Sequence, residues 1–293
     1  MRFDILADEP IAVHASEPLA SFYQLSPFVW RDNACTHVML RAVNHSDVPA
    51  EKIARIYHGT TPDGLNFYMD AEPAIAPGPH PQDRDGCEDP TVALFDHRLY
   101  VYYTGWNEAE KRGRLMIAVG AEPCRLDKRG VALDSRPECE NPKEAEIARA
   151  RDGTWRLFFE FAAQGASRIG VASSSRVDGP WELGNPPFER RAGSWDDWHL
   201  STGPAVTIGG TPVMFYNGAT KKAQWRIGWI RFDPDYGRVL DRCAAPVVEP
   251  KKPKGDETDI AFASSAVREG DLIRLYYSVA DQYMRRVTLE AKH

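Results

Sequence analysis

The sequence has no paired-cysteine motif, no long apolar run and no excess of basic residues. Its five cysteines are scattered without a Cys-x-x-Cys pair, so zinc-binding and redox motifs are unsupported. No run of about 18 apolar residues occurs, so we expect no segment that spans a membrane. The net charge of -6 argues against a nucleic-acid partner, because phosphate binding needs a basic surface.

Other missing signatures narrow the class further. The first residues contain no apolar segment of signal-peptide length, and the odd, scattered cysteines are typical of reduced thiols; both favour a cytoplasmic protein. A glycine-rich phosphate loop, a His-Glu-x-x-His motif and a serine nucleophile elbow are all absent. We therefore expect neither a cofactor nor a metal. Helical periodicity is also nearly absent, which favours an all-β fold.

What the sequence does contain is a long repeat. Five times an apolar strand ends in a bulky residue followed by a marker residue, at intervals of 56 to 63 residues. These markers are Arg41, Thr104, Glu160, Asn217 and Ser278. After each marker comes a loop and then an arginine that opens the next strand, at intervals of 54 to 59 residues. These arginines are Arg55, Arg114, Arg168, Arg226 and Arg285.

A repeat of this length, built of strands and turns, predicts a five-bladed β-propeller with about four strands in each blade. Five copies fill the chain, so we expect one domain over residues 1–293. The fifth copy ends too early to have an outer strand. A segment near the N-terminus, either Ile5–Leu6 or Ile11–His14, is expected to supply it. A two-sheet sandwich is the alternative, but it gives no reason for five equal units.

The most distinctive stretch is Gly86–Thr91, Gly-Cys-Glu-Asp-Pro-Thr, where two adjacent carboxylates stand at the entrance of a predicted hairpin. If the hairpins are inner strands, five such entrances converge on one channel. Aligned on the repeat, the entrances are Ser26–Pro27, Glu88–Pro90, Glu144–Glu146, Ser201–Pro204 and Glu257–Asp259. Three of them carry carboxylates, and clustered carboxylates raise one another's pKa, which suits a general acid and a general base. Solvation of the channel mouth is the structural alternative.

Aromatic residues near these entrances are consistent with a sugar-binding pocket. Trp106 follows the second hairpin, and Trp195 and Trp198 precede the fourth; flat rings with a polar edge suit a partly polar ligand. His199 stands at the fourth entrance, where a ligand-binding role and a structural role are both open. Four more tryptophans fall inside strand patterns and are expected in the blade core: Trp155, Trp181, Trp225 and Trp229.

Together these features resemble glycoside hydrolase family 130, the five-bladed-propeller β-mannoside phosphorylases and β-mannosidases. The matching segments run through all five repeats and are Leu40–Ala42, Arg55, Thr61–Phe67, Gly86–Pro90, Arg168–Ser175, Phe215–Gly218, Arg226–Gly228 and Tyr276–Asp281. The Gly-x-Glu-Asp-Pro signature is the most specific of them. The resemblance implies that its aspartate, Asp89, is the general acid, and that the phosphorylases relay its proton through a sugar hydroxyl.

The chain departs from the family pattern on the side of the pocket that the resemblance assigns to phosphate. The third hairpin often ends in an arginine that contacts phosphate, and Glu160 stands there; the fourth often reads Tyr-His-Gly, and Asn217 replaces the histidine. We expect Glu160 to face Arg41 and Arg55 and to pair with one of them. A bound dianion beside a glutamate is costly in a poorly hydrated pocket, so the sequence favours water as the nucleophile.

The resulting hypothesis is an inverting glycoside hydrolase that acts on β-mannosides or related small oligosaccharides. Asp89 is the expected acid, and the base is left open among Glu144, Glu160 and Glu257. The expected substrate-binding residues are Arg41, Arg55, Glu88, Trp106, His199, Asn217, Asp259 and Asp281. A phosphate-dependent β-mannoside phosphorylase and a non-catalytic sugar-binding propeller are the alternatives. The expected partner is an oligosaccharide, and a homo-oligomer is left open.

Overall fold

The fold is known from a computed structural model that describes residues 1–32, 34–250 and 258–292. These ranges form 24 strands and three short 3-10 helices, η1 (Leu19–Ser21), η2 (Pro49–Glu51) and η3 (Pro81–Asp83). The expectation of an all-β protein is confirmed. Within the same ranges, no helix is long and apolar enough to cross a membrane.

The first two blades follow one another along the chain. The first contains β3 (Tyr23–Arg31), β4 (Thr36–Val43), β5 (Ala54–Thr61) and β6 (Asn66–Ile75), in that order from one edge, with β2 (Ala12–His14) added parallel to β6. The second contains β7 (Gly86–Phe95), β8 (Arg98–Asn107), β9 (Arg112–Glu122) and β10 (Arg125–Leu133). Apart from β2, neighbouring strands in both blades are antiparallel.

The third and fifth blades have the same meander. The third contains β11 (Glu140–Arg149), β12 (Trp155–Ala163), β13 (Ala166–Ser174) and β14 (Glu182–Gly184). The fifth contains β22 (Ala261–Glu269), β23 (Leu272–Val279) and β24 (Tyr283–Lys292), and β1 (Arg2–Pro10) pairs antiparallel with β24 as its outer strand. That one domain spans 1–293 stays a prediction.

The fourth blade consists of interrupted strands that form two small sheets. One sheet contains β15 (His199–Ser201), β18 (Asn217–Ala219) and β19 (Trp225–Ile227); the other contains β16 (Ala205–Ile208), β17 (Thr211–Met214), β20 (Ile230–Phe232) and β21 (Val239–Arg242). Two backbone hydrogen bonds join the sheets, from Phe215 N to Pro204 O and from Gly228 N to Tyr216 O. The two sheets therefore continue one another along a single blade.

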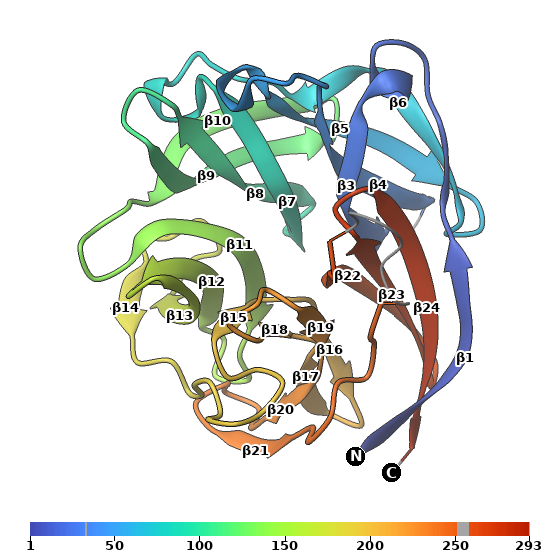
Figure 1. The fold of residues 1–293 in the computed structure, drawn as a ribbon, viewed down its shortest axis with the longest axis vertical. Coiled ribbons are helices and arrows are strands. Elements are labelled where there is room, and N and C mark those ends of the chain that lie inside the picture. The colour runs from blue at the N-terminus through green and yellow to red at the C-terminus, as the bar shows by residue number, and fades with distance from the viewer. Residues whose placement is uncertain (33, 251–257, 293) are drawn as a thin grey trace.

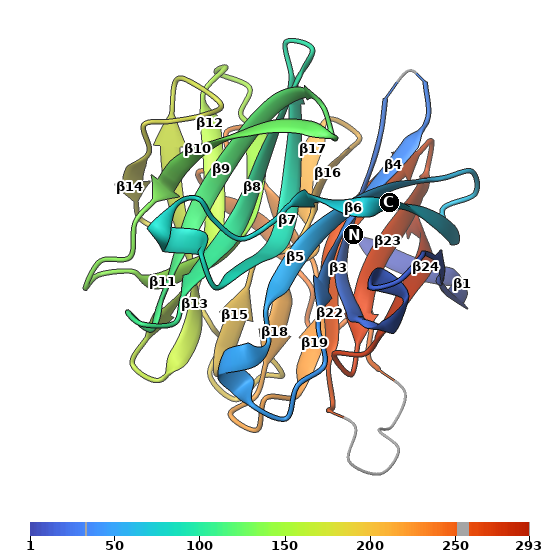
Figure 2. The ribbon, with the colours of Figure 1, turned by 90° about the horizontal axis from the view of Figure 1, so that it is seen from above.

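Viewed along the central axis, the blades stand side by side in a ring (Figure 1). The strands β3, β7, β11, β15 and β22 lie nearest the centre, and β3 contacts both β7 and β22 while β11 contacts β7. Figure 2 shows the blades edge-on, with the strands running through the thickness of the ring. The expected β-propeller is confirmed, and the strands of the described ranges form six hydrogen-bonded sheets, two of which make up the fourth blade.

The hairpin that opens the second blade illustrates why these residues form strands. Asp96 and His97 join β7 to β8, and both have a positive φ, 49° and 58°, as a two-residue type I′ turn requires. The next residues, Leu99–Tyr103, are β-branched or aromatic except for one leucine and are mostly buried. A strand that is covered on both faces by neighbouring blades has no need for polar alternation.

Successive side chains of one strand point to opposite faces of a blade, so they pack against different neighbouring blades. On β12, Phe158 packs in a cluster with blade four, and Phe159 packs in another cluster with blade two. Full burial of each ring contributes on the order of 1.5–3 kcal/mol. Gly170 makes room for Phe159, because a Cβ at this glycine would lie 2.4 Å from Cζ of the ring.

The repeat has a structural cause in the inner strand of each blade. In the first three blades the marker residue pairs with the inner-strand residue just before the pairing register shifts, and in the fourth it pairs with the last residue of β15. In the fifth blade the register shifts one residue later, after Ala263. The residues opposite the markers are Leu25, Glu88, Lys143, Ser201 and Phe262. The next residue is thus Ser26, Asp89, Glu144, Thr202 or Ala263, and the first three have φ between 48° and 49°. A β-bulge of this kind re-aims a side chain, here toward the axis.

One alignment from the sequence is wrong. The fifth entrance is Phe262–Ala263, not Glu257–Asp259, because Ser278 pairs with Phe262. Glu257 lies outside the described residues, and Asp259 precedes the inner strand β22. The second marker also shifts in this blade: Arg285 pairs with Tyr277, so it is not equivalent to the other four arginines.

Candidate active site

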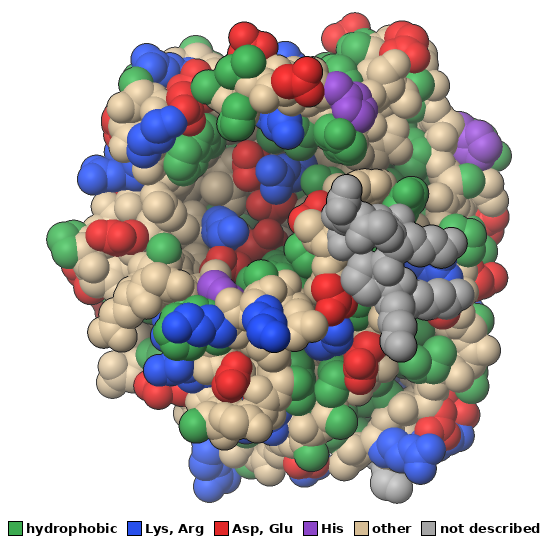
Figure 3. Space-filling view, in the orientation of Figure 1, with side chains coloured by type: hydrophobic (Ala, Val, Ile, Leu, Met, Phe, Trp, Pro, Cys, Tyr) green, Lys and Arg blue, Asp and Glu red, His purple; other side chains and the backbone are tan. Residues whose placement is uncertain are grey.

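A cavity of about 270 Å³ lies at the centre of the ring, where the re-aimed inner-strand residues meet. Figure 3 shows acidic and basic side chains together in this central hollow. Its lining includes Ser26, Arg41, Asp89, Lys143, Glu144, Glu160, Ser167, His199, Trp225, Phe262, Ser278 and Asp281. Six residues that the sequence analysis singled out therefore come together: Arg41, Asp89, Glu144, Glu160, His199 and Asp281.

Asp89 sits at the bulge of β7 and is almost fully buried. Its Oδ1 accepts hydrogen bonds from Ser26 Oγ at 2.9 Å and from Arg41 at 3.2 Å. Burial would raise the pKa of Asp89, but the Arg41 guanidinium and the Lys143 ammonium outweigh burial and hold the pKa below its usual value. Asp89 is therefore a carboxylate in the unliganded protein at neutral pH.

Glu144 occupies the equivalent bulge of β11 and has the opposite tendency. Burial raises the pKa of Glu144 well above its usual value, and the nearby Asp89 carboxylate raises it further, against the opposing effect of Lys143. Asp89 and Glu144 line the same cavity and interact, so their titrations are coupled, and their pKa values are shifted in opposite directions. Carboxyl groups whose environments push their pKa values apart are the usual basis of acid–base assignments.

Glu160 faces Lys143 instead of the two arginines that we expected. The two residues are directly opposite each other on β12 and β11, and their side chains form an ion pair at 3.3 Å. Ser167 Oγ also donates to Glu160 at 2.7 Å. The Glu160 side chain is only 4% exposed, so these two partners fix its position at the cavity wall. The expected pairing of Glu160 with Arg41 or Arg55 is wrong.

Arg41 reaches across from β4 to the two adjacent acids of the signature. It pairs with Glu88 at 3.1 Å and with Asp89 at 3.2 Å, and its Nε is buried without a hydrogen-bond partner among the described residues. A buried donor without a partner suits a ligand oxygen. Asp281, at φ 53°, also lines the cavity, and burial raises its pKa although Arg41 opposes that effect.

His199 is held as a neutral ring. The backbone N–H of Ser167 donates to His199 Nδ1 at 3.0 Å, so Nδ1 is unprotonated and Nε2 carries the hydrogen. Burial lowers the pKa of His199, the charge of Glu160 opposes that effect, and Arg168 supports it. His199 therefore offers a hydrogen-bond donor to the cavity and no positive charge at neutral pH.

Several expected substrate-binding residues lie elsewhere, each for a local reason. Arg55 pairs with Ala42, the neighbour of Arg41, so alternation of side chains puts it on the opposite face of the sheet. Trp106 is on β8, where it pairs with Gly86 of β7, and its Nε1 donates to Glu108 at 2.9 Å. Neither Arg55 nor Trp106 lines the cavity. Glu88 does not line it either, but its carboxylate pairs with Arg41, which does.

Two further expected residues have structural roles. Asn217 is fully buried; its Nδ2 donates to Thr202 O and Ala263 O, and its Oδ1 accepts from Ala263 N at 2.7 Å. This amide joins blades four and five. Asp259 pairs with Arg226 at 2.8 Å and accepts from Gln224 at 3.1 Å, which directs its carboxylate away from the cavity lining.

Residues that the sequence analysis missed complete the cavity. Lys143 could have been found from the repeat, since it precedes Glu144 and stands opposite the marker Glu160. Trp225, which we expected in the blade core, is the tryptophan that lines the cavity. Trp195 instead stacks on Tyr216 within blade four, with ring centroids 5.4 Å apart. Strand position alone does not reveal which face of a blade a ring occupies.

Comparisons with known proteins were made for sequence and for fold. No family model matches the chain. It is 24% identical over 281 residues to a 1,2-beta-oligomannan phosphorylase of Thermoanaerobacter sp. (strain X514), covering 89% of this chain and 88% of the relative. A beta-1,2-mannobiose phosphorylase of the same organism is also 24% identical, over 267 residues and 87% and 85% of the two chains.

Solved structures with the same fold cover nearly the whole chain. The beta-1,2-mannobiose phosphorylase of Listeria innocua, solved with beta-1,2-mannobiose, has a TM-score of 0.80 at 18% identity over 99% of this chain and 97% of that chain. A second structure, with a TM-score of 0.75 at 20% identity over 98% and 94%, comes from a study of GH130 mannoside phosphorylases and of hydrolases that target beta-1,2 mannosidic linkages in Candida mannan.

These matches confirm the resemblance to glycoside hydrolase family 130. Its relatives are enzymes that act on mannosides, and the family includes phosphorylases as well as hydrolases. Because both full-length curated relatives are phosphorylases, the comparisons favour the phosphorylase alternative over the hydrolase that we inferred from the sequence.

Proposed function

We propose that this protein cleaves a β-mannosidic bond in a small oligosaccharide by means of the carboxyl groups of the central cavity. The observation that carries the proposal is that Asp89 and Glu144 occupy equivalent bulges of β7 and β11 and line the same cavity, where their pKa values are shifted in opposite directions. General acid catalysis needs a proton held at neutral pH beside the leaving oxygen. Arg41, which also lines the cavity, holds a sugar hydroxyl beside this pair.

In the proposed reaction, the pair gives its proton to the glycosidic oxygen while the bond from that oxygen to the anomeric carbon breaks. Glu160 takes a proton from a water molecule, whose oxygen forms the new bond to the anomeric carbon from the opposite face of the sugar. Lys143 and Ser167 keep the Glu160 carboxylate fixed for this role. A base and an acid separated by room for one water give inversion.

The charges of the cavity support water as the acceptor. Its described lining contains four carboxyl groups but only two cations, Arg41 and Lys143, and each cation is already paired with a carboxylate. His199 is neutral, because its Nδ1 accepts the backbone N–H of Ser167. A phosphate dianion needs several converging free donors in a partly desolvated site. To bind here, it would have to displace Glu160 from Lys143.

Phosphorolysis is the second candidate function, and it is the one that the full-length relatives support. It keeps the same acid pair and the same sugar contacts but replaces water with inorganic phosphate. Lys143 would then release Glu160 and bind the phosphate. The two candidates differ in one product, mannose or mannose 1-phosphate.

The experiment is to incubate the protein with β-1,2-mannobiose, with and without phosphate, and to assay mannose and mannose 1-phosphate. Mannose released at the same rate without phosphate supports hydrolysis. Mannose 1-phosphate that forms only with phosphate replaces hydrolysis by phosphorolysis. Calorimetric binding without turnover under either condition would contradict both and support the non-catalytic alternative.

A variant pair tests the role of Glu160. Glu160→Gln is expected to lower hydrolysis by about a hundredfold or more, as removal of a general base does. Glu146→Gln is the matched control, because Glu146 lies on β11 but does not line the cavity. Equal losses in both variants, or no loss in Glu160→Gln, would show that Glu160 is not the base.

A further inference from the structure

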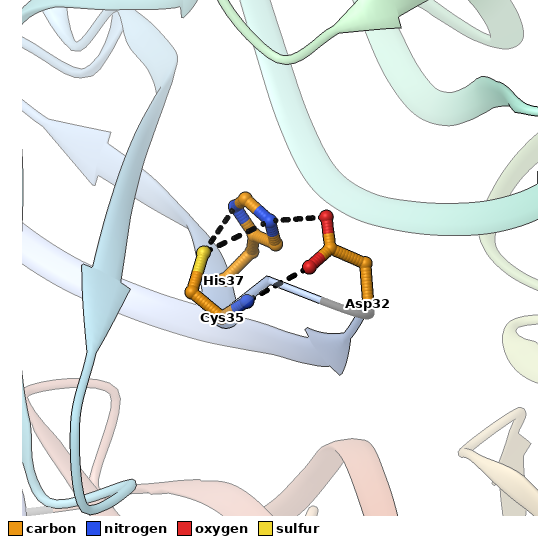
Figure 4. A group of neighbouring side chains, drawn as sticks. All are labelled: Asp32, Cys35 and His37. Atoms are coloured by element: carbon orange, nitrogen blue, oxygen red, sulfur yellow. Dashed lines mark hydrogen bonds and ion pairs between the residues drawn. The ribbon is translucent and has the colours of Figure 1, made fainter.

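A second cluster of chemically reactive side chains lies at the other end of the first blade. Asp32, Cys35 and His37 come from the tip of the β3–β4 hairpin, and their ligand-type atoms all lie within 4.8 Å of one another. Figure 4 shows the three side chains turned toward a common point. The cavity residue Ser26 is six residues back along the chain from Asp32, or about 20 Å of extended strand. The cluster is therefore separate from the candidate active site.

The hairpin tip holds the Asp32 carboxylate in one orientation. Its Oδ1 accepts the backbone N–H groups of Ala34 and Cys35, at 2.7 and 2.9 Å, which leaves Oδ2 directed at His37 Nε2, 2.9 Å away. Cys35 Sγ approaches the same ring nitrogen, at 3.3 Å.

His37 contacts a second histidine, His58, which in turn contacts a second aspartate, Asp70. His37 Nδ1 lies 3.0 Å from His58 Nε2, and His58 Nδ1 lies 2.6 Å from Asp70 Oδ2. The indole of Trp30 stacks on His37, with ring centroids 5.0 Å apart and planes 14° apart, and so fixes the plane of the ring. His58 is 8% exposed and therefore buried, whereas Asp70 at the end of this series of contacts is exposed.

The ring hydrogens of the two histidines are too few to supply every contact in this series. Three contacts join Asp32, His37, His58 and Asp70 in series, and two neutral imidazoles carry only two ring hydrogens. If the two hydrogens lie on His37 Nδ1 and His58 Nδ1, every inner contact is satisfied. The vacant position is then His37 Nε2, which faces Asp32 and Cys35.

We propose that Asp32 Oδ2, Cys35 Sγ and His37 Nε2 bind one divalent transition-metal ion of the zinc class, with a fourth position open to solvent. An oxygen, a thiolate and an imidazole nitrogen are ligands that zinc accepts, and two anionic ligands balance its charge. His58 and Asp70 act as the outer partners that orient the liganding imidazole, as such ions commonly require. On binding, the thiol loses its proton to solvent and a metal–sulfur bond forms.

This site lacks the pattern that zinc motifs usually show in a sequence. A paired-cysteine motif does not describe it, because the ligands are three different residue types in the spacing Asp-x-x-Cys-x-His. Only the hairpin geometry and the neighbouring strand β5, which carries His58, bring the ligands and their partners together. The ion would fasten the tip of the first blade and take no part in sugar cleavage.

The test uses the full chain without an affinity tag, stripped with a chelator. Zn²⁺ is titrated by calorimetry, and Co²⁺ is added as a spectroscopic probe. We expect one equivalent of Zn²⁺ to bind, the Tm to rise by several degrees, and Co²⁺ to give a sulfur-to-metal charge-transfer band. Binding of no metal, or a Co²⁺ spectrum without the sulfur band, would overturn the proposal.

Variants separate this site from adventitious binding. Cys35→Ser should remove the charge-transfer band and lower Zn²⁺ affinity by a hundredfold or more, and Asp70→Asn should weaken affinity by about 10–100-fold through His58. Cys124→Ser, at an exposed cysteine elsewhere, is the matched control and should change neither. If Cys124→Ser abolishes the band, or Cys35→Ser keeps it, the ion is not held by this cluster. Circular dichroism of each stripped variant verifies that it is folded.

Discussion

The bulges of blades one to three and the matching positions of blades four and five use the same place in the repeat for different purposes. In the first three blades the residue there, Ser26, Asp89 or Glu144, has a positive φ and lines the cavity. In the last two, Thr202 and Ala263 take part in hydrogen bonds that hold neighbouring blades together. A repeated backbone feature thus sets where a side chain can reach, while the residue type decides whether it does chemistry.

We expect the largest effect from replacing a bulge residue that lines the cavity. Asp89→Asn keeps the shape of the side chain but cannot give or accept the proton in the same way. We expect turnover of β-1,2-mannobiose to fall by about a hundredfold or more with little change in Tm. Near-normal turnover in this variant, measured by release of mannose or mannose 1-phosphate, would remove Asp89 from the reaction.

A buried acid at the boundary of blades three and four is expected to make stability depend on pH. Burial raises the pKa of Glu146 to about 8, although the backbone N–H of Ala205 donates to it. Since the unfolded value is about 4.3, the folded protein binds the extra proton, and stability falls as pH rises from about 5 to about 8.

Replacement of this acid is the corresponding test. Glu146→Gln keeps the acceptor for Ala205 without a titrating group, so at pH 8 it should be more stable than wild type by on the order of 3 kcal/mol. The advantage should shrink toward pH 5, as followed by denaturant unfolding at both values. The control is Glu182→Gln at an exposed position of β14. A pH-independent difference would mean that Glu146 does not titrate as described.

Asn217 tests the structural side of the comparison. Asn217→Ala removes three buried hydrogen bonds, two of them between blades four and five, and should lower the free energy of unfolding by about 2–3 kcal/mol. Turnover per folded molecule should stay close to wild type, because Asn217 does not line the cavity. Asn185→Ala, at an exposed asparagine, is the matched control for stability. A selective loss of turnover would return Asn217 to the binding residues.

The smallest effects sharpen the comparison at equivalent positions. Thr202→Val removes a hydrogen bond to the Glu144 carbonyl and should cost about 1 kcal/mol of stability without moving the pH profile. Ser26→Ala removes a hydrogen bond to Asp89, so the pKa of Asp89 should rise and the acidic limb of the activity profile should move to higher pH. If the activity profile shifted equally in both variants, the bulge residues of blades one to three and the matching residues of blades four and five would not differ in function.

The sequence predicted the fold because its markers record real pairing: Arg41, Glu160 and their equivalents stand opposite the bulges. It also predicted Asp89 and Glu144 as neighbours for the same reason. It failed at the fifth blade, where the register around Ala263 differs and no carboxylate marks the entrance. It also failed for side chains such as Arg55, since the period of the repeat does not state which face of a blade a residue occupies.

The pairing of β1 with β24 has a mechanical consequence. Arg2 lies opposite Lys292, and the first and last strands run antiparallel from there (Figure 1). A force that pulls these two residues apart loads the hydrogen bonds one after another, like a zipper, and never all of them in shear. Each bond contributes only about 1 kcal/mol, so this edge of the ring peels at low force. The hydrogen bonds between β7 and β8 cannot be opened in this way from the end of the hairpin, because a turn joins the two strands there.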